Sequence, residues 1–297
     1  MALSTKTIKR RIKSIANTKK ITKAMEMISA VKMRRAVASA SATRNYAELA
    51  WQMLQDVTRK AGPRHHPLLA ERAVKKMGLI LITSNRGLAG GFSSKLVQEV
   101  DLFINKIKKE KNVDVEVLVM GKKGRKIYQN FGHTIAAEFE KVDVTKALAE
   151  ILPLSQMAAA DFINAKYDQI GVAYMEYISA IKQVPVIKPI FPIKQKNHVT
   201  IVEKNNKSEG RPTDFIFEPN PLKVLEMLLP RLIEMQLYQA VLESDASEHS
   251  ARMVAMQSAS DAAGDMIKEL NTTFNNARQA AITKEIAEVI GGAAALE

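Results

Sequence analysis

The chain has 297 residues, of which 46% are hydrophobic and 25% charged, and it contains no cysteine. This composition is typical of a folded protein, and it excludes disulfide bonds and thiolate metal sites. No apolar run approaches 18 residues, so the sequence predicts neither a transmembrane span nor a signal peptide.

The net charge of +13 is unevenly distributed along the chain. Residues 1–60 carry 14 basic and 3 acidic side chains, whereas residues 219–297 carry 6 basic and 11 acidic ones. The two ends of the chain therefore attract each other, and surplus positive charge remains for an acidic partner.

The first segment, residues 1–61, contains no glycine and no proline, which predicts a helix approaching about 90 Å in length. Its apolar stripe begins at Ile8, Ile12 and Ile15 and restarts at positions 21, 24, 28 and 31. The interrupted spacing predicts a change of phase in the helix–helix seam near residue 18. Gly62-Pro63 ends the run, and residues 62–76 are predicted to be a linker.

The middle segment, residues 77–218, changes from a helical period to alternating strands and helices. Strands are predicted at 77–83, 113–120, 167–177 and 184–192, and helices at 92–109, 122–131 and 145–165. This alternation predicts a Rossmann-like α/β domain with a largely parallel sheet. The polar residues 194–214 are predicted to form an exposed hairpin, and residues 215–218 a return strand.

The last segment, residues 219–297, is predicted to be a second long helix. Residues 231–290 contain one glycine, Gly264, and no proline. A regular 4–3 spacing predicts a coiled-coil seam with many small residues. The seam positions are Leu242, Ala246, His249, Met253, Met256, Ser260, Ala263, Ile267, Leu270, Phe274, Ala277 and Ala281. We interpret Gly264 as a point of close helix approach.

Two glycine-containing segments are candidate nucleotide or phosphate sites. Residues 84–91 lie between a strand and a helix, but their glycines follow G-x-x-G-G and not G-x-G-x-x-G. Residues 121–126 are basic but lack the phosphate-loop pattern. We favour a tight turn or a partner contact by Arg86 for the first, and a solvated helix start for the second. A nucleotide-binding α/β enzyme stays open as a further hypothesis.

The remaining polar residues give little sign of catalysis. His65 and His66 are adjacent and have no nearby set of metal ligands, and His249 belongs to the predicted seam. Neither paired carboxylates nor a nucleophile elbow occurs, so we expect a protein without catalytic residues, metal or cofactor. The basic N-terminal helix also permits a nucleic-acid-binding coiled coil, although Tyr46 and Trp51 alone provide no stacking platform.

Both ends of the chain resemble the ATP synthase gamma subunit family. The motif ITKAMEMISAVKMR at residues 21–34 resembles the family's N-terminal helix, and SARMVAM at 250–256 and ARQAAITKEI at 277–286 resemble its C-terminal helix. FEPNP at 217–221 and the loop at 84–91 are similar to further family segments. The resemblance begins near residue 2 and continues to the end of the chain.

The resemblance implies a central rotor shaft in which the terminal helices form an antiparallel coiled coil inside an alpha3beta3 hexamer. It places the α/β domain on the epsilon subunit and the membrane c-ring, and it assigns nucleotide chemistry to the beta subunits. Expected contacts with beta are carried over onto Lys20, Lys23, Met25, Arg252, Arg278, Gln279 and Thr283. Expected contacts with the c-ring or epsilon are Arg86, Phe215, Phe217 and Glu218.

Two departures from the family bear on location. Position 89 is alanine where many relatives carry cysteine, so the thiol-regulated insertion of chloroplast forms is not expected. We also expect the chain to begin at the shaft helix without a transit peptide, with a processed organellar chain as the alternative. Both features favour a bacterial protein at the cytoplasmic face of the inner membrane, attached to that membrane only through its partner subunits.

Overall fold

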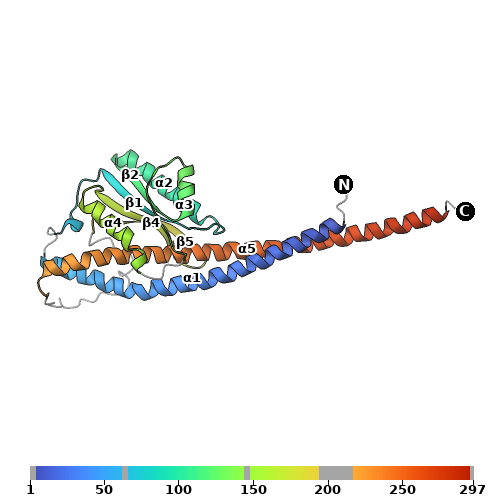
Figure 1. Cartoon of the computed structure of the whole chain (residues 1–297), viewed down its shortest axis with the longest axis horizontal. Helices are drawn as coiled ribbons and strands as arrows, with labels where there is room; N and C mark the ends of the chain where they lie inside the picture. The colour runs from blue at the N-terminus through green and yellow to red at the C-terminus, as the bar shows by residue number, and fades with distance from the viewer. Residues whose placement is uncertain (1–4, 62–65, 144–147, 194–216, 295–297) are drawn as a thin grey trace. The chain divides into compact units, whose positions relative to one another are not determined.

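The computed structural model describes residues 5–61, 66–143, 148–193 and 217–294, which belong to two compact units. The distal unit combines Met1–Ala30 with Arg252–Glu297, and the sheet unit is Val31–Ala251. Two long helices, α1 (Thr5–Ala61) and α5 (Pro221–Ala294), contribute to both units (Figure 1). This division falls within both helices, after Ala30 in α1 and after Ala251 in α5.

The sheet unit contains five strands in the order β3-β2-β1-β4-β5. Strand β1 (Lys76–Ile82) pairs in parallel with β2 (Asp114–Met120) and with β4 (Gln169–Tyr177). Strand β3 (Ile135–Phe139) is parallel to β2, and β5 (Gln183–Phe191) is antiparallel to β4. The predicted α/β class with a largely parallel sheet is confirmed.

Both faces of the sheet are covered, which explains why its central strands are apolar runs without polar alternation. On one face, Leu79 and Leu81 pack with α2 (Phe92–Lys111) and α3 (Lys122–Asn130). On the other face, Ile80 and Ile82 pack with α4 (Leu152–Ile163) and with α5. Two short 3-10 helices, Pro67–Leu69 and Leu148–Glu150, complete the described elements.

The middle segment differs from the prediction in two places. Strand β3 was not predicted, because its short sequence IAAEF is only half-buried at the sheet edge and carries a weak β signal. The helix predicted over 145–165 begins only at Leu152, one residue before Pro153. Pro153 suits the first turn of a helix, where no backbone N–H is required.

Other predicted features fall on residues that are only partly described or not described at all. The predicted hairpin at 194–214 lies outside the described residues, as do positions 215 and 216 of the predicted return strand. The remainder of that strand, Phe217 and Glu218, has no strand structure. Helix α5 follows closely, with the side-chain oxygen of Asn220 accepting a hydrogen bond from the Lys223 N–H at 2.9 Å.

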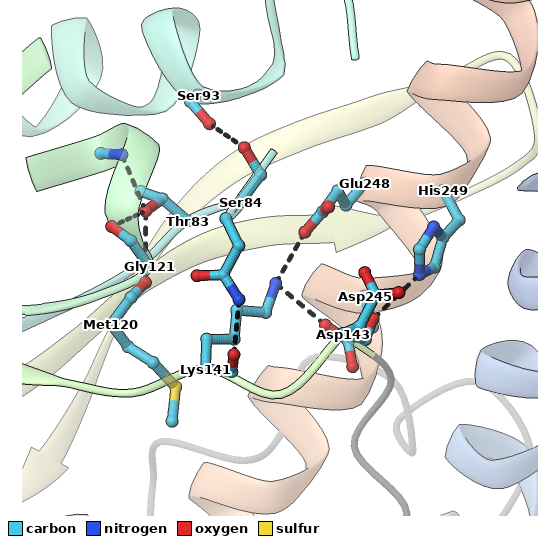
Figure 2. A network of polar contacts seen from close by, with 12 residues as sticks. Thr83, Ser84, Ser93, Met120, Gly121, Lys141, Asp143, Asp245, Glu248 and His249 are labelled. Atoms are coloured by element: carbon cyan, nitrogen blue, oxygen red, sulfur yellow. Dashed lines mark hydrogen bonds and ion pairs between the residues drawn. The ribbon is translucent and has the colours of Figure 1, made fainter. Parts of the chain in front are cut away.

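A buried threonine explains two glycines at the start of α3, Gly121 just before the helix and Gly124 in its first turn. The Thr83 hydroxyl bonds to the carbonyls of Met120 (3.2 Å) and Gly121 (3.1 Å) and accepts the Gly124 N–H at 3.1 Å (Figure 2). A Cβ at Gly124 would lie 2.3 Å from the Thr83 side chain, and one at Gly121 would lie 2.5 Å from the Thr83 carbonyl oxygen. Gly121 also has a φ of +115°. Packing therefore accounts for both glycines.

We predict that Gly124→Ala lowers the free energy of unfolding by about 1–3 kcal/mol, because the added methyl group overpacks the Thr83 site. Chemical unfolding of the whole chain measures this change. Gly87→Ala is the matched control, since its Cβ would meet only the flexible end of Lys123 at 3.4 Å. Equal stability of the two variants would contradict the explanation.

In the sheet unit, α1 and α5 lie side by side and run in opposite directions (Figure 1). The Thr43 hydroxyl donates to the Gln239 side-chain oxygen at 2.7 Å. Trp51, Leu54 and Val57 of α1 join the same apolar cluster as the first turns of α5. The two helices and one face of the sheet thus share a single core.

In the distal unit, the seam of α5 matches the prediction. Met256, Ser260 and Ala263 are buried, and the later predicted positions through 277 are half-buried. Gly264 lies against the flexible end of Lys19, since a Cβ there would be 2.9 Å from the lysine Nζ. The interpretation of Gly264 as a close approach of helix backbones is therefore wrong, because the side chain of Lys19 fills this position.

The predicted phase change in α1 is also wrong. The buried positions Ile8, Thr22 and Ser29, with half-buried Ile15 between them, are separated by seven residues each, so one seam continues through residue 18. The hydroxyl groups donate to backbone carbonyls of their own helix, Thr22 to Lys19 at 3.0 Å and Ser29 to Met25 at 2.7 Å. Such internal bonds make a small polar residue tolerable in the seam.

The apolar stripe predicted to form that seam points outward instead. Ile21, Ile28 and Val31 are 60%, 57% and 46% exposed, and Ala24 is exposed as well. Hydrophobicity alone misplaced the seam, since Thr22 and Ser29 are buried while Ile21 and Ile28, one position earlier in each case, are exposed. The apolar stripe at Ile21, Ile28 and Val31 therefore remains exposed on the surface of α1.

We predict that Ile8→Ala costs about 2–4 kcal/mol of local stability, whereas Ile28→Ala changes it by less than about 0.5 kcal/mol. Amide hydrogen exchange over residues 5–30 is the appropriate measurement, because a helix end can open without global unfolding. Similar protection factors in the Ile8→Ala and Ile28→Ala variants would contradict the observed seam and favour the one predicted from hydrophobicity.

Candidate functional site

A buried lysine attaches the segment after β3 to α5. The Lys141 ammonium group lies 2.9 Å from an Asp245 carboxylate oxygen and 2.8 Å from a Glu248 oxygen (Figure 2). The three side chains are 2%, 0% and 5% exposed, respectively. Burial by itself lowers the pKa of a lysine, but the two carboxylates outweigh it and raise the pKa of Lys141 above its ordinary value. Lys141 is therefore charged at neutral pH.

The same segment contacts both long helices and the loop after β1. The Asp143 carboxylate forms an ion pair with Lys32 of α1. The backbone carbonyl oxygen of Asp143 lies 3.2 Å from Nε2 of His249 on α5. The Asn85 side-chain amide donates to the carbonyl oxygen of Lys141. We call the set Lys32, Asn85, Lys141, Asp143, Asp245, Glu248 and His249 the polar collar.

The polar collar was not predicted from sequence, apart from the assignment of His249 to the seam. Its one available signal is the run Ser244–Ser250 in α5, where seven consecutive residues include two carboxylates and a histidine. All seven are buried, which is unusual for charged residues without partners. Their main cationic partner, Lys141, lies more than 100 positions away along the chain, so no local pattern reveals it.

Polar side chains of the loop at 84–91 form hydrogen bonds within the fold. The Ser84 and Ser93 hydroxyls lie 2.8 Å apart in the interior (Figure 2). The Asn85 side-chain oxygen accepts the Lys122 N–H at 3.3 Å. His66 caps a 3-10 turn through Nδ1, and His65 lies outside the described residues. Within the described ranges, no group of three or more His, Cys, Asp or Glu residues is arranged to hold a metal ion.

The residues expected to contact beta all belong to the distal unit but do not converge on one place. Lys20 and Lys23 are exposed, and Lys23 forms an ion pair with Glu26 at 2.9 Å. Met25 is half-buried. Arg252 is only 7% exposed and has partners within the chain, so its guanidinium group is not freely displayed.

The other three expected beta contacts lie further along α5. Arg278, Gln279 and Thr283 are exposed, and the Thr283 hydroxyl donates to the Gln279 carbonyl at 3.0 Å. Arg278 is 26 residues from Arg252, a separation of about 39 Å along a helix. The expected contacts are thus spread over several turns and do not form one compact site.

The residues expected to meet the c-ring or epsilon belong to the sheet unit. Phe217 packs against the core shared by the sheet and α5, Glu218 is exposed, and Phe215 lies outside the described residues. Arg86 is exposed and near enough to Asp143 to lower the pKa of that carboxyl group. Phe217 and Arg86 thus both interact with groups of this chain.

Comparison with known proteins places the chain in a family. The family model described as ATP synthase matches residues 4–296. The ATP synthase gamma chain of Legionella pneumophila is 37% identical over 291 residues, covering 98% of this chain and 99% of the relative. The chain belongs to the ATP synthase gamma family. The gamma chain of Roseiflexus castenholzii is 41% identical, covering 99% of this chain and 98% of the relative.

Solved structures show the same fold for this gamma-family chain. A chain of the Euglena gracilis mitochondrial ATP synthase superposes with a TM-score of 0.65 at 17% identity, covering 99% of this chain and 94% of that one. A chain from the central stalk and c-ring structure of the Tetrahymena thermophila enzyme gives 0.60 at 23% identity, covering 81% and 99%. These similarities support the paired long helices and the sheet domain.

The distal unit of this gamma-family chain has two groups of exposed apolar residues. Ile21, Met27 and Ile28 of α1 are each more than half exposed. Four large apolar residues near the end of α5, Ile282, Ile286, Val289 and Ile290, are 47–73% exposed. Across the described ranges no helix is both long and apolar enough to cross a bilayer, so these residues do not mark a membrane-spanning helix.

The Lys32–Asp143 ion pair gives a prediction about acid stability. A hydrogen bond from Lys32 holds the pKa of Asp143 below its ordinary value of 3.8. A carboxylate with a lowered pKa contributes stability above its unfolded-state pKa, and this contribution is lost as the pH falls through the folded-state pKa. The stability difference between wild type and Asp143→Asn should therefore be fully present at pH 7 and shrink as the pH falls below 3.8.

Urea unfolding at pH 7, 5 and 3 measures this difference. Lys32→Gln serves as the partner variant, and the double variant should be no less stable than either single one at pH 7. A wild-type advantage that stays constant down to pH 3 would show that the Asp143 charge does not stabilise the fold.

Proposed function

We propose that this chain is the central rotor shaft, the gamma subunit, of a proton-translocating F-type ATP synthase. In this role it turns with the membrane c-ring inside an alpha3beta3 hexamer and couples rotation to ATP synthesis or hydrolysis in the beta subunits. The observation that carries the proposal is the match to gamma chains over nearly the whole length. The paired helices of 57 and 74 residues support it.

We assign a separate proposed role to each segment of the chain. Residues 1–61 and 219–297 form the shaft, residues 62–76 link it to the α/β domain, and residues 77–218 face epsilon and the c-ring. Phe215, Phe217, Glu218 and Arg86 are the proposed contact residues on that side. The chain itself is non-catalytic and binds no cofactor, which leaves nucleotide chemistry to the beta subunits.

The distal unit is proposed to contact the alpha3beta3 hexamer. Its exposed surface combines cations such as Lys20 and Arg278 with the outward apolar stripe at Ile21 and Ile28. Exposed ion pairs are each worth about 0–1 kcal/mol, so several weak contacts distributed along the helices favour a shaft that turns past its partners. Contacts with protein subunits account for these exposed cations without a nucleic-acid partner. Membership of the gamma family leaves the nucleic-acid-binding alternative without support.

The proposed location is the cytoplasmic face of a bacterial inner membrane, where the chain is held by partner subunits. Reconstitution tests the function: purified chain is combined with alpha and beta subunits, and ATP hydrolysis is measured. We expect the chain to restore the activity of the assembled complex. Failure of correctly folded chain to do so, with a known gamma chain active in the same assay, would contradict the proposal.

We predict that Arg278→Ala lowers the rate of ATP synthesis in the whole complex two- to fivefold, since it removes one exposed charge worth up to about 1 kcal/mol. Lys109→Ala is the matched control, because Lys109 is an exposed cation on α2 in the sheet unit. The unfolding midpoint of the isolated chain should be the same for both variants. Equal synthesis rates would remove Arg278 from the proposed beta contacts.

A further inference from the structure

The polar collar occupies a particular place in the sheet unit. On α5 the sheet unit ends at Ala251, and the residues Asp245, Glu248 and His249 lie within the last two turns before that point. On α1 the sheet unit begins at Val31, and Lys32 is the next residue. The polar contacts to both helices therefore gather at the end of the sheet unit from which the helices continue.

Most of the apolar packing between α5 and the sheet lies on one side of the collar. Leu225, Leu229, Leu232, Leu237 and Val241 belong to the apolar cluster that also contains sheet residues, and all of them precede Asp245, whereas Ala251 packs against the second cluster beyond it. Apolar burial resists separation of the sheet from the helix, but it has no direction. It gives comparatively little resistance to sliding of the sheet along the helix or to rotation around it.

The ion cluster supplies a contact that does have direction. Asp245 and Glu248 are three residues apart, so their backbone positions differ by about 4.5 Å along the axis of α5. The Lys141 ammonium group bonds to both at 2.9 and 2.8 Å. Displacement of Lys141 along α5 in either direction therefore lengthens one of the two ion pairs. Because the cluster is buried, water cannot readily replace the lost contact.

The contact with α1 adds a second point of attachment. Asp143 is two residues from Lys141, and it forms an ion pair with Lys32 while its carbonyl oxygen faces His249. The Asn85 amide ties the carbonyl of Lys141 to the loop after β1. One short segment thus connects the sheet to both helices at the same level.

We propose that the polar collar, with Lys141 at its centre, is the joint that transmits torque between the α/β domain and the two shaft helices. This inference rests on the proposed function. Lys141 acts as a positioning residue, since it fixes the sheet relative to α5 and contacts no nucleotide. Without the collar, the sheet and α5 keep the shared apolar core and hydrogen bonds such as that from Tyr174 to Glu243 at 3.0 Å, which resist slippage under load less than the buried ion cluster does.

The experiment replaces the ion cluster by apolar residues, K141M/D245L/E248M, in the whole ATP synthase reconstituted into vesicles. Replacing a complete buried ion cluster in this way often preserves or raises stability, so the variant separates torque transmission from folding. We expect ATP hydrolysis within twofold of wild type but proton pumping per ATP hydrolysed reduced at least threefold. The unfolding midpoint of the isolated chain is measured in parallel.

Three further variants distinguish a joint from a general structural effect. R125A removes the exposed ion pair with Glu138 and should leave pumping per ATP unchanged. L96A weakens the core on the opposite face of the sheet and should lower stability without uncoupling. K141E/E248K again gives one lysine and two carboxylates, and it should recover part of the lost coupling.

Wild-type pumping per ATP in the assembled apolar variant would overturn the inference, as would equal uncoupling in L96A. If the apolar variant does not assemble, E248Q and D143N each remove one collar contact. Reduced pumping per ATP in either, with R125A unaffected, supports the joint, and normal pumping in both overturns it. A wild-type chain that cannot support coupled pumping at all would instead contradict the proposed function.

Discussion

The burial of α5 against one face of the sheet is the interaction on which the rest of the structure depends. From Leu232 to Ser250 most positions of this helix are buried, because the sheet, α4 and α1 surround it. From position 281 to 290 every residue of the same helix is exposed. One continuous helix therefore contributes to the core of the sheet unit and also carries a fully exposed segment, in which Ile282, Ile286, Val289 and Ile290 face solvent among polar residues.

The two kinds of contact in the sheet unit have different physical consequences. The apolar core contributes most of the stabilisation and accommodates small shifts, whereas the buried ion pairs of Lys141 require a defined geometry. A buried lysine is costly unless its charge is matched, and here two carboxylates of α5 match it. The polar collar is thus better suited to fixing the position of the sheet along α5 than to stabilising the fold as a whole.

Local patterns were sufficient to predict the two long helices, the four longer strands and the seam of α5, because each repeats a regular period over many residues. The seam of α1 was misplaced, since Thr22 and Ser29 are buried for their small size while Ile21 and Ile28 point outward. Strand β3 is too short and too exposed to produce a clear period. Lys141 and its carboxylates could not be paired from sequence, because their proximity is created only by the fold.

The outward stripe at Ile21 and Ile28, together with the apolar residues near the end of α5, has a consequence for the chain before assembly. An isolated subunit displays these side chains to water, and exposed apolar patches promote self-association. The charge of +13 opposes this by mutual repulsion between copies. Because salt screens that repulsion, the colloidal stability of the free subunit depends on ionic strength, and its handling differs from that of a compact domain with a closed core.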